Sequence, residues 1–162
     1  RDARDYAGER PVVAHPPCAR WGQFAPVNQA RYGIPVGSDD GCFDAAIRSV
    51  RKWGGVLEHP YRSIAWTRSL LRPDEWVAEV EQFAYGHPAK KRTWLVAVGS
   101  GALPELRRSV GKPTAYVSGG PGASMTSESR RAAGIRLLGR REREETPIAF
   151  AQMLVDIALG AV

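Results

Sequence analysis

The sequence predicts one α/β domain, in which helices cover a mainly parallel sheet on both sides to form three layers. Three observations support this prediction: two short apolar runs that each end at prolines, an amphipathic segment between them, and an overall composition of 43% hydrophobic and 25% charged residues. A chain of 162 residues is long enough for one domain with a buried core and short for two. We therefore expect residues 1–162 to form a single domain.

The first apolar run lies in PVVAHPP, at residues 11–17, and has the pattern of a short buried strand that stops at a proline pair. Residues 22–41 are rich in glycine, proline and polar side chains, which predicts a long, mobile loop. From Cys42 to Trp53, apolar residues recur at spacings of three and four. This spacing predicts an amphipathic helix with one buried face, which would also bury Cys42.

The second run, GGVLEHP at residues 54–60, repeats the design of the first and ends at a proline. Strand, helix and strand at this spacing predict a βαβ unit with parallel strands. Ligands of such sheets bind outside the carboxyl ends of the strands. Cys18 and Glu58, which follow the two runs, are therefore expected at one edge of the sheet.

The rest of the chain supplies further elements. WVAEVEQFAYG (76–86) and RTWLVAVG (92–99) have the pattern of two more strands around a turn. Residues 119–145 include a charge-dense stretch, typical of a solvated helix or a mobile loop. Thr146 and Pro147 are residues preferred at a helix start, and the closing helix would place Phe150, Leu154 and Ile157 on one face.

The net positive charge of the chain indicates which class of partner it could bind. The net charge of +6 and the pI of about 9.7 favour a polyanion such as nucleic acid, although a basic surface also serves solubility alone. Two cysteines provide no disulfide framework, and no segment has the pattern of a signal peptide or a membrane span. These features predict a cytoplasmic protein without a membrane partner.

Three fragments in one order resemble the cytosine-5 DNA methyltransferases: HPPC after a strand, LEHP after the next, and YGHPAKKRTWLVAVG later. Members of that family carry the nucleophile in Pro-Pro-Cys, an acid in Glu-Asn-Val, and a later Tyr-Gly-x-Pro-Gln-x-Arg-x-Arg segment. The chain is also similar to short phage and prophage proteins that carry HPPC and GGVLEHP together. The resemblance implies a Rossmann-like, methyltransferase-like sheet with a reduced N-terminal part.

The resemblance implies a definite chemistry. The thiolate of Cys18 would add to carbon 6 of a pyrimidine, held in direction by the rigid Pro-Pro turn. Glu58 would assist at ring nitrogen 3, a role for which its burial should raise its pKa. The base would be flipped out of duplex DNA or come from a single strand.

The sequence also departs from the family pattern. Family members hold S-adenosylmethionine on a Gly-rich turn well before Pro-Pro-Cys, and no such turn precedes Cys18. The one Gly-rich loop, VSGGPGAS at 117–124, would replace that turn only in a permuted order. His59 stands where the family has Asn, and Lys91 and Thr93 stand where it has arginines. S-adenosylmethionine is therefore expected from the resemblance alone, with its binding residues unknown.

Seven further side chains are candidates for DNA contact. Trp21 could stack on a flipped base, and basic groups could hold a phosphate or the base carbonyl. The candidates are Arg20, Trp21, His59, His87, Lys90, Lys91 and Arg92. Each also has a structural interpretation, as a core ring or part of a solvated face. A zinc site built from His15, Cys18, His59 and His87 is the less favoured alternative, so we expect no metal.

Three functions remain open from the sequence. The first is a DNA-modifying transferase that attacks a pyrimidine through Cys18 with help from Glu58. The second is a catalytically degenerate DNA-binding module of phage origin. The third is a cysteine-dependent enzyme that acts on a nucleotide or another small substrate.

Overall fold

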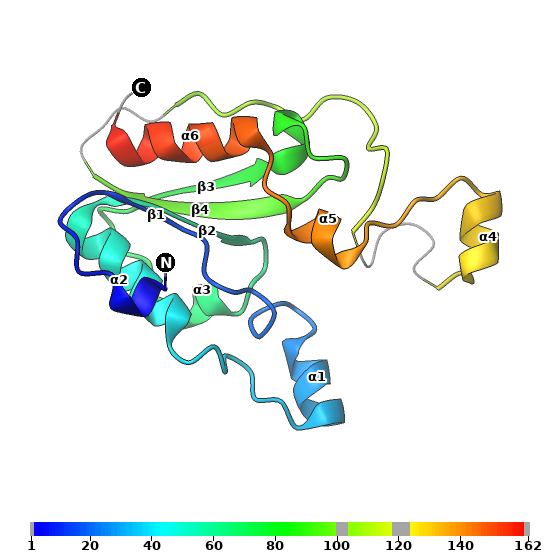
Figure 1. The fold of residues 1–162 in the computed structure, drawn as a ribbon, viewed down its shortest axis with the longest axis horizontal. Coiled ribbons are helices and arrows are strands. Elements are labelled where there is room, and N and C mark those ends of the chain that lie inside the picture. Colours follow the sequence, from blue (N-terminus) through cyan, green and yellow to red (C-terminus); the bar gives the residue numbers. More distant parts are fainter. Residues whose placement is uncertain (1, 100–103, 118–123, 161–162) are drawn as a thin grey trace. The chain divides into compact units, whose positions relative to one another are not determined.

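The computed structural model describes residues 2–99, 104–117 and 124–160 (Figure 1). These residues form two compact units. The first unit comes from Arg1–Glu79, Thr93–Glu105 and Met153–Val162, and the second from Val80–Arg92 and Leu106–Gln152. The first unit contains most of the sheet, together with Cys18 and Glu58.

The sheet has four strands in the order β1-β2-β4-β3. They are β1 (Val12–Ala14), β2 (Gly55–Pro60), β3 (Trp76–Glu81) and β4 (Arg92–Val98). All four follow the predicted runs, and the predicted α/β class is confirmed. β1 and β2 pair in parallel over three residue pairs, from Val12 with Gly55 to Ala14 with Leu57.

The prediction of a mainly parallel sheet is wrong, because β2 and β4 pair antiparallel over six residue pairs. The neighbouring strands β4 and β3 add to this, because their connection is too short for a parallel crossover. Residues 82–91 supply a short link with one 3-10 helix, η2 (Gln82–Tyr85), whereas two parallel strands need a longer crossover. The predicted strand at 76–86 accordingly ends at Glu81.

Helices cover both faces of the sheet in the first unit (Figure 1). The predicted amphipathic helix is present as α2 (Cys42–Trp53) and lies on one face with the short α3 (Ala65–Arg68). The Met153–Leu159 part of α6 (Ile148–Leu159) lies on the other face. A core between α2 and the sheet includes Ala14, Trp21, Phe43, Ala46, Ile47, Val50, Leu57, Ala65, Trp66 and Val96. The first strand is thus anchored on α2.

The segment at 22–41, predicted as a loop, contains a helix, α1 (Ala25–Tyr32). Its first turn carries a proline, which is tolerated there because that N–H needs no helical partner. Gly33 ends it in the left-handed conformation (φ +67°), with its N–H donating to the Gln29 carbonyl. Phe24, Val27 and Tyr32 remain exposed, so no buried periodic face marked this helix in the sequence.

The second unit has a small core of its own, made of Ala89, Ala115 and Leu138 with Val117 packed against them. Two short helices, α4 (Ser127–Ala132) and α5 (Arg140–Glu144), lie within the stretch predicted as a mobile loop. Phe150, at the start of α6, packs edge-on against Tyr85 at 5.4 Å between ring centroids. Most of the Gly-rich segment VSGGPGAS, residues 118–123, lies outside the described residues.

Candidate active site

A histidine–glutamate pair lies at the carboxyl ends of β1 and β2. Because Ala14 pairs with Leu57, the next residues, His15 and Glu58, come out at the same end of the parallel strands. Nδ1 of His15 and Oε2 of Glu58 are 2.8 Å apart. The Glu58 side chain is only 11% exposed, against 37% for His15. A carboxylate with so little access to water requires a polar partner, and His15 supplies one.

Cys18 lies three residues after His15, on an exposed turn. The Cys18 carbonyl accepts hydrogen bonds from the N–H groups of Trp21 (3.0 Å) and Gly22 (3.1 Å), which fix the backbone after the thiol. Before it, Pro16 and Pro17 restrict the backbone through their rings. The thiol is therefore accessible from outside and is carried on a backbone with little freedom.

His59 lies on the opposite side of β2 from Glu58, since side chains alternate along a strand. Its ring is fully buried and packs edge-on against Phe43 at 5.1 Å and Trp66 at 6.0 Å between ring centroids. Burial lowers the pKa of His59 to about 4, although the charge of Glu58 and the Pro17 carbonyl act in the opposite direction. His59 is therefore a neutral core ring at pH 7, close to the Pro17 carbonyl of the HPPC turn and without the exposure that a DNA contact needs.

The buried His59 ring should make stability depend on pH. Its pKa of about 4 lies below the ordinary 6.5, so between these values the unfolded chain binds more protons. The free energy of unfolding should fall by about 3 kcal/mol as the pH drops from 7 to 4. Urea unfolding of the wild type and of His59→Phe, which keeps a buried ring, measures this. The variant should lose that part of the pH dependence, and equal pH slopes for the two proteins would contradict the assignment.

Trp21, a candidate for base stacking, is a core residue with 2% of its surface exposed. Its Nε1–H donates to Oδ2 of Asp39 at 2.7 Å, and the same oxygen accepts the Phe43 N–H at the start of α2. The Trp21 carbonyl accepts from the Ser63 hydroxyl at 3.1 Å. The indole ring thus fastens the segment after Cys18 to α2, and it presents no free face for a base.

The basic candidates divide between the two units. Arg20, half-buried, follows Cys18 in the first unit, and its carbonyl accepts the Gly37 N–H at 2.9 Å. In the second unit, Lys90 and Arg92 are exposed and Lys91 is half-buried. His87 is buried and bonds to the Ala89 backbone at 2.8 Å. The structure therefore brings His15 and Glu58 into contact, and Cys18 follows His15 by three residues on an exposed turn.

A groove of about 510 Å³ runs along β1 and reaches the turn that carries Cys18. Residues 11–17, which include β1, run along its length, and the N-terminal segment and α2 form its walls. The wall residues are Asp2, Ala3, Tyr6, Cys42, Ala46 and Ser49. Its volume lies in the usual range for small-molecule sites. No motif marked Tyr6 or Ser49 as site residues, because they meet only through the fold.

The groove has the volume to take a nucleoside-sized ligand. It offers the Ser49 hydroxyl, the Tyr6 ring and the Asp2 carboxylate, and one end is formed by His15 and the two prolines. Hydrogen bonds from Arg4 lower the pKa of Asp2 to about 2, so this carboxylate is ionised at neutral pH. Arg4 already binds this carboxylate, so the groove is lined by the Asp2–Arg4 pair, the Ser49 hydroxyl and the Tyr6 ring.

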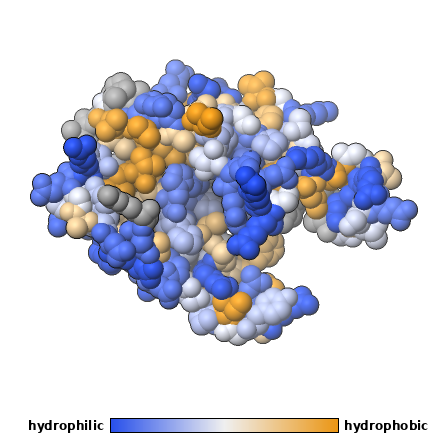
Figure 2. All heavy atoms as spheres, viewed as in Figure 1, coloured by the Kyte–Doolittle hydropathy of each residue, from blue (hydrophilic) through white to orange (hydrophobic). Residues whose placement is uncertain are grey.

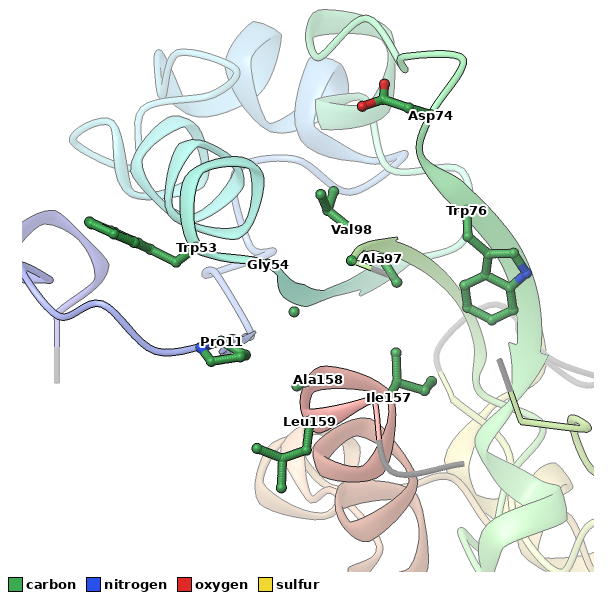
Figure 3. A pocket seen from close by; sticks show the side chains of 13 residues that line it. Pro11, Trp53, Gly54, Asp74, Trp76, Ala97, Val98, Ile157, Ala158 and Leu159 are labelled. Carbon is green, nitrogen blue, oxygen red and sulfur yellow. The ribbon is translucent and has the colours of Figure 1, made fainter. Parts of the chain in front are cut away.

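A second cavity, of about 250 Å³, lies where β2 begins and β4 ends (Figure 3). The indole rings of Trp53 and Trp76 stand on opposite sides of it, and Ile157 and Leu159 come from α6 (Figure 3). Figure 2 shows apolar side chains gathered in the region of α6, where Val155 and Leu159 are exposed. Asp74 is the one ionisable residue among those that line this cavity, so it holds no acid–base pair.

Within residues 2–99, 104–117 and 124–160, no three or more His, Cys, Asp or Glu residues form a group that could hold a metal ion. The same part of the chain has no helix with the length and apolar character needed to cross a bilayer. Compared with known proteins, the chain matches no family model, no curated protein and no solved structure. The function must therefore be inferred from the site itself.

Proposed function

We propose that this protein modifies a pyrimidine base of DNA through transient covalent attack by Cys18, as in the cytosine-5 DNA methyltransferases that its motifs resemble. One observation carries the proposal. The parallel pairing of β1 with β2 brings the HPPC turn to the strand end that holds Glu58, and His15 contacts Glu58 there at 2.8 Å. A nucleophile and an acid on adjacent strand ends are what addition to a ring double bond requires.

Each residue has a step in this reaction. The Cys18 sulfur forms a bond to carbon 6 of the pyrimidine as the double bond between carbons 5 and 6 opens. The electron pair moves into the ring, where a proton shared with the His15–Glu58 pair stabilises it at nitrogen 3. Carbon 5 then becomes the nucleophile, and after it has accepted a group it loses its proton as the Cys18 sulfur leaves carbon 6, which restores the double bond. A methyl donor, when bound, would supply the group that carbon 5 accepts, and the groove along β1 is the place we propose for it.

Further features support a nucleic-acid substrate of this kind. The net charge of +6 favours association with a polyanion. The exposed turn at Cys18 suits a base that has left the stack, whether flipped from a duplex or taken from a single strand. The Rossmann-like relationship that we propose rests on the parallel pair β1–β2 with helix α2 between the two strands, and it does not extend to β4, which is antiparallel to β2 inside the sheet.

The proposal predicts a covalent adduct with an oligonucleotide that contains 5-fluorocytosine. Fluorine cannot leave carbon 5 as a cation, so an enzyme that has attacked carbon 6 stays attached after group transfer. A denaturing gel should show a shifted band for the wild type with single-stranded oligonucleotide and S-adenosylmethionine. Cys18→Ser should lose that band completely. The matched control, Cys42→Ser, should keep it.

Two other outcomes point to the other functions. Salt-dependent binding of the oligonucleotide without any adduct, with and without S-adenosylmethionine, would overturn the transferase and favour a DNA-binding module. Neither adduct nor DNA binding would leave a small substrate in the groove along β1 as the remaining role. That role is tested by whether adenosine or cytidine protects Cys42 against alkylation.

A further inference from the structure

We propose that His15 is a catalytic residue, which takes the proton of the Cys18 thiol, and that Glu58 acts as its positioning carboxylate. This inference rests on the proposed function and deepens it, because it assigns the base that generates the thiolate. In the sequence, His15 stood out only as a weak candidate for binding zinc. The structure gives it a different role through its contact with Glu58.

The contact determines which ring nitrogen remains for chemistry. Glu58 meets His15 at Nδ1, so in the neutral ring this nitrogen carries the hydrogen and donates it to the carboxylate. The lone pair is then on Nε2, on the far side of the ring from Glu58. The carboxylate also stabilises the imidazolium that forms when Nε2 accepts a proton. Other enzymes activate a weak nucleophile with the same arrangement, in which a carboxylate orients an imidazole and the imidazole takes the proton of the nucleophile.

Solvent exposure increases from the carboxylate to the imidazole, and the thiol is exposed as well. Glu58 is 11% exposed, His15 is 37% exposed, and Cys18 is exposed at the surface. The imidazole is thus more exposed than the carboxylate that it contacts, and the thiol three residues later is exposed as well. Three residues span at most about 10 Å between Cα atoms, and the two proline rings leave the backbone of this span little freedom. A span of this length allows the imidazole of His15 to reach the Cys18 thiol.

Other ionisable groups around His15 are few. The groove that His15 lines also contains Asp2, Tyr6 and Cys42, and Asp2 is already engaged by Arg4 at its carboxylate. On the other face of β2, His59 stays neutral because burial lowers its pKa to about 4. Glu58 is thus the carboxylate in direct contact with the His15 ring.

The step balances without an additional reactant. The Cys18 S–H bond breaks, and its proton moves to Nε2 of His15. The sulfur then bonds to carbon 6 while the electron pair of the ring double bond moves towards carbon 5 and nitrogen 3. In the absence of a methyl donor, the imidazolium returns its proton to carbon 5. The net change is addition of the thiol across the double bond, and its reversal regenerates both groups.

The test measures alkylation of Cys18 by iodoacetamide between pH 5 and 10, with both cysteine peptides quantified by mass spectrometry. In this reaction the sulfur bonds to the acetamide carbon, iodide leaves, and the thiol proton passes to His15. The Cys18 rate in the wild type should rise in a step below the pH at which an ordinary thiol ionises, near 8.5, because the imidazole takes the thiol proton. Cys42 is the internal reference in the same chain, because burial raises its pKa and keeps its thiol form.

His15→Asn and Glu58→Gln should each lower the Cys18 rate at pH 7 about tenfold and move the step towards that of an ordinary thiol, near pH 8.5. The Cys42 rate should stay the same in both variants, which shows that the fold is retained. An unchanged Cys18 profile in His15→Asn would overturn the proposal. If that variant does not fold, the wild-type profile alone tests the proposal. A single step near pH 8.5 in the wild type would exclude proton transfer from the Cys18 thiol to His15.

Alkylation needs no DNA, so its outcome separates this inference from the proposed function. An adduct with 5-fluorocytosine DNA combined with an unchanged alkylation profile in His15→Asn would leave the DNA-modifying function standing and remove His15 from it. The expected alkylation profile without any DNA adduct would support proton transfer from Cys18 to His15 and would overturn DNA as the substrate.

Discussion

Glutamine in place of Glu58 is expected to slow adduct formation with 5-fluorocytosine DNA about 100-fold or more, the range that a general acid–base group contributes. The Glu58 side chain is 11% exposed and accepts from Nδ1 of His15 at 2.8 Å. The substituted amide keeps the shape of the side chain and removes the negative charge that holds an imidazolium. Quench-flow or manual sampling of the gel-shifted band gives the rate.

The control for this change is Glu9→Gln, at an exposed carboxyl in the first unit outside the site. Both variants lower the negative charge by one, so any general effect on DNA affinity appears in both. Glu58→Gln should affect the rate at saturating DNA, whereas Glu9→Gln should not. Equal rates for wild type and Glu58→Gln under saturation would show that Glu58 has no part in the attack.

Alanine in place of Gly55 should produce the largest loss of stability, about 3 kcal/mol or more. Gly55 has φ +116°, and a Cβ there would lie 2.1 Å from the Val12 carbonyl oxygen and 2.5 Å from the Val12 nitrogen. Because Val12 and Gly55 are paired residues, the clash separates β1 from β2. The HPPC turn would then lose its register with Glu58, so adduct formation should fall together with stability.

Gly33→Ala is the matched control for this prediction. Gly33 also has a positive φ, of +67°, but no atom lies within 4 Å of its ideal Cβ. It should therefore cost only the strain of a left-handed alanine, about 1 kcal/mol. Urea unfolding followed by tryptophan fluorescence measures both variants. Similar losses of stability in the two variants would mean that a Cβ at position 55 does not clash with the Val12 backbone.

Local patterns in the sequence predicted the elements that form the site. The apolar runs closed by prolines gave β1 and β2, and the spacing of Phe43, Ala46, Ile47 and Val50 gave α2, because burial on one face leaves a periodic trace. The parallel pairing that brings HPPC to the end of β2 followed from the length of the connection between the strands.

Other features depend on contacts between distant residues and leave no local pattern. The order of β4 and β3 in the sheet is set by pairing partners, so the antiparallel strand beside β2 was not predicted. Trp21 looked like a stacking residue because its partner, Asp39, lies 18 positions away. The role of His15 was also missed, because it depends on the contact of its Nδ1 with Glu58 on the neighbouring strand, 43 positions away in the sequence.

The most direct test of the account is to locate the cysteine that becomes attached to the base. Wild-type protein is trapped on a single-stranded 5-fluorocytosine oligonucleotide with S-adenosylmethionine, digested with nuclease and protease, and examined by tandem mass spectrometry. The nucleotide mass should be found on the peptide that contains Cys18 and not on the peptide that contains Cys42. A modified Cys42 peptide, or DNA bound without any modified cysteine, would contradict it.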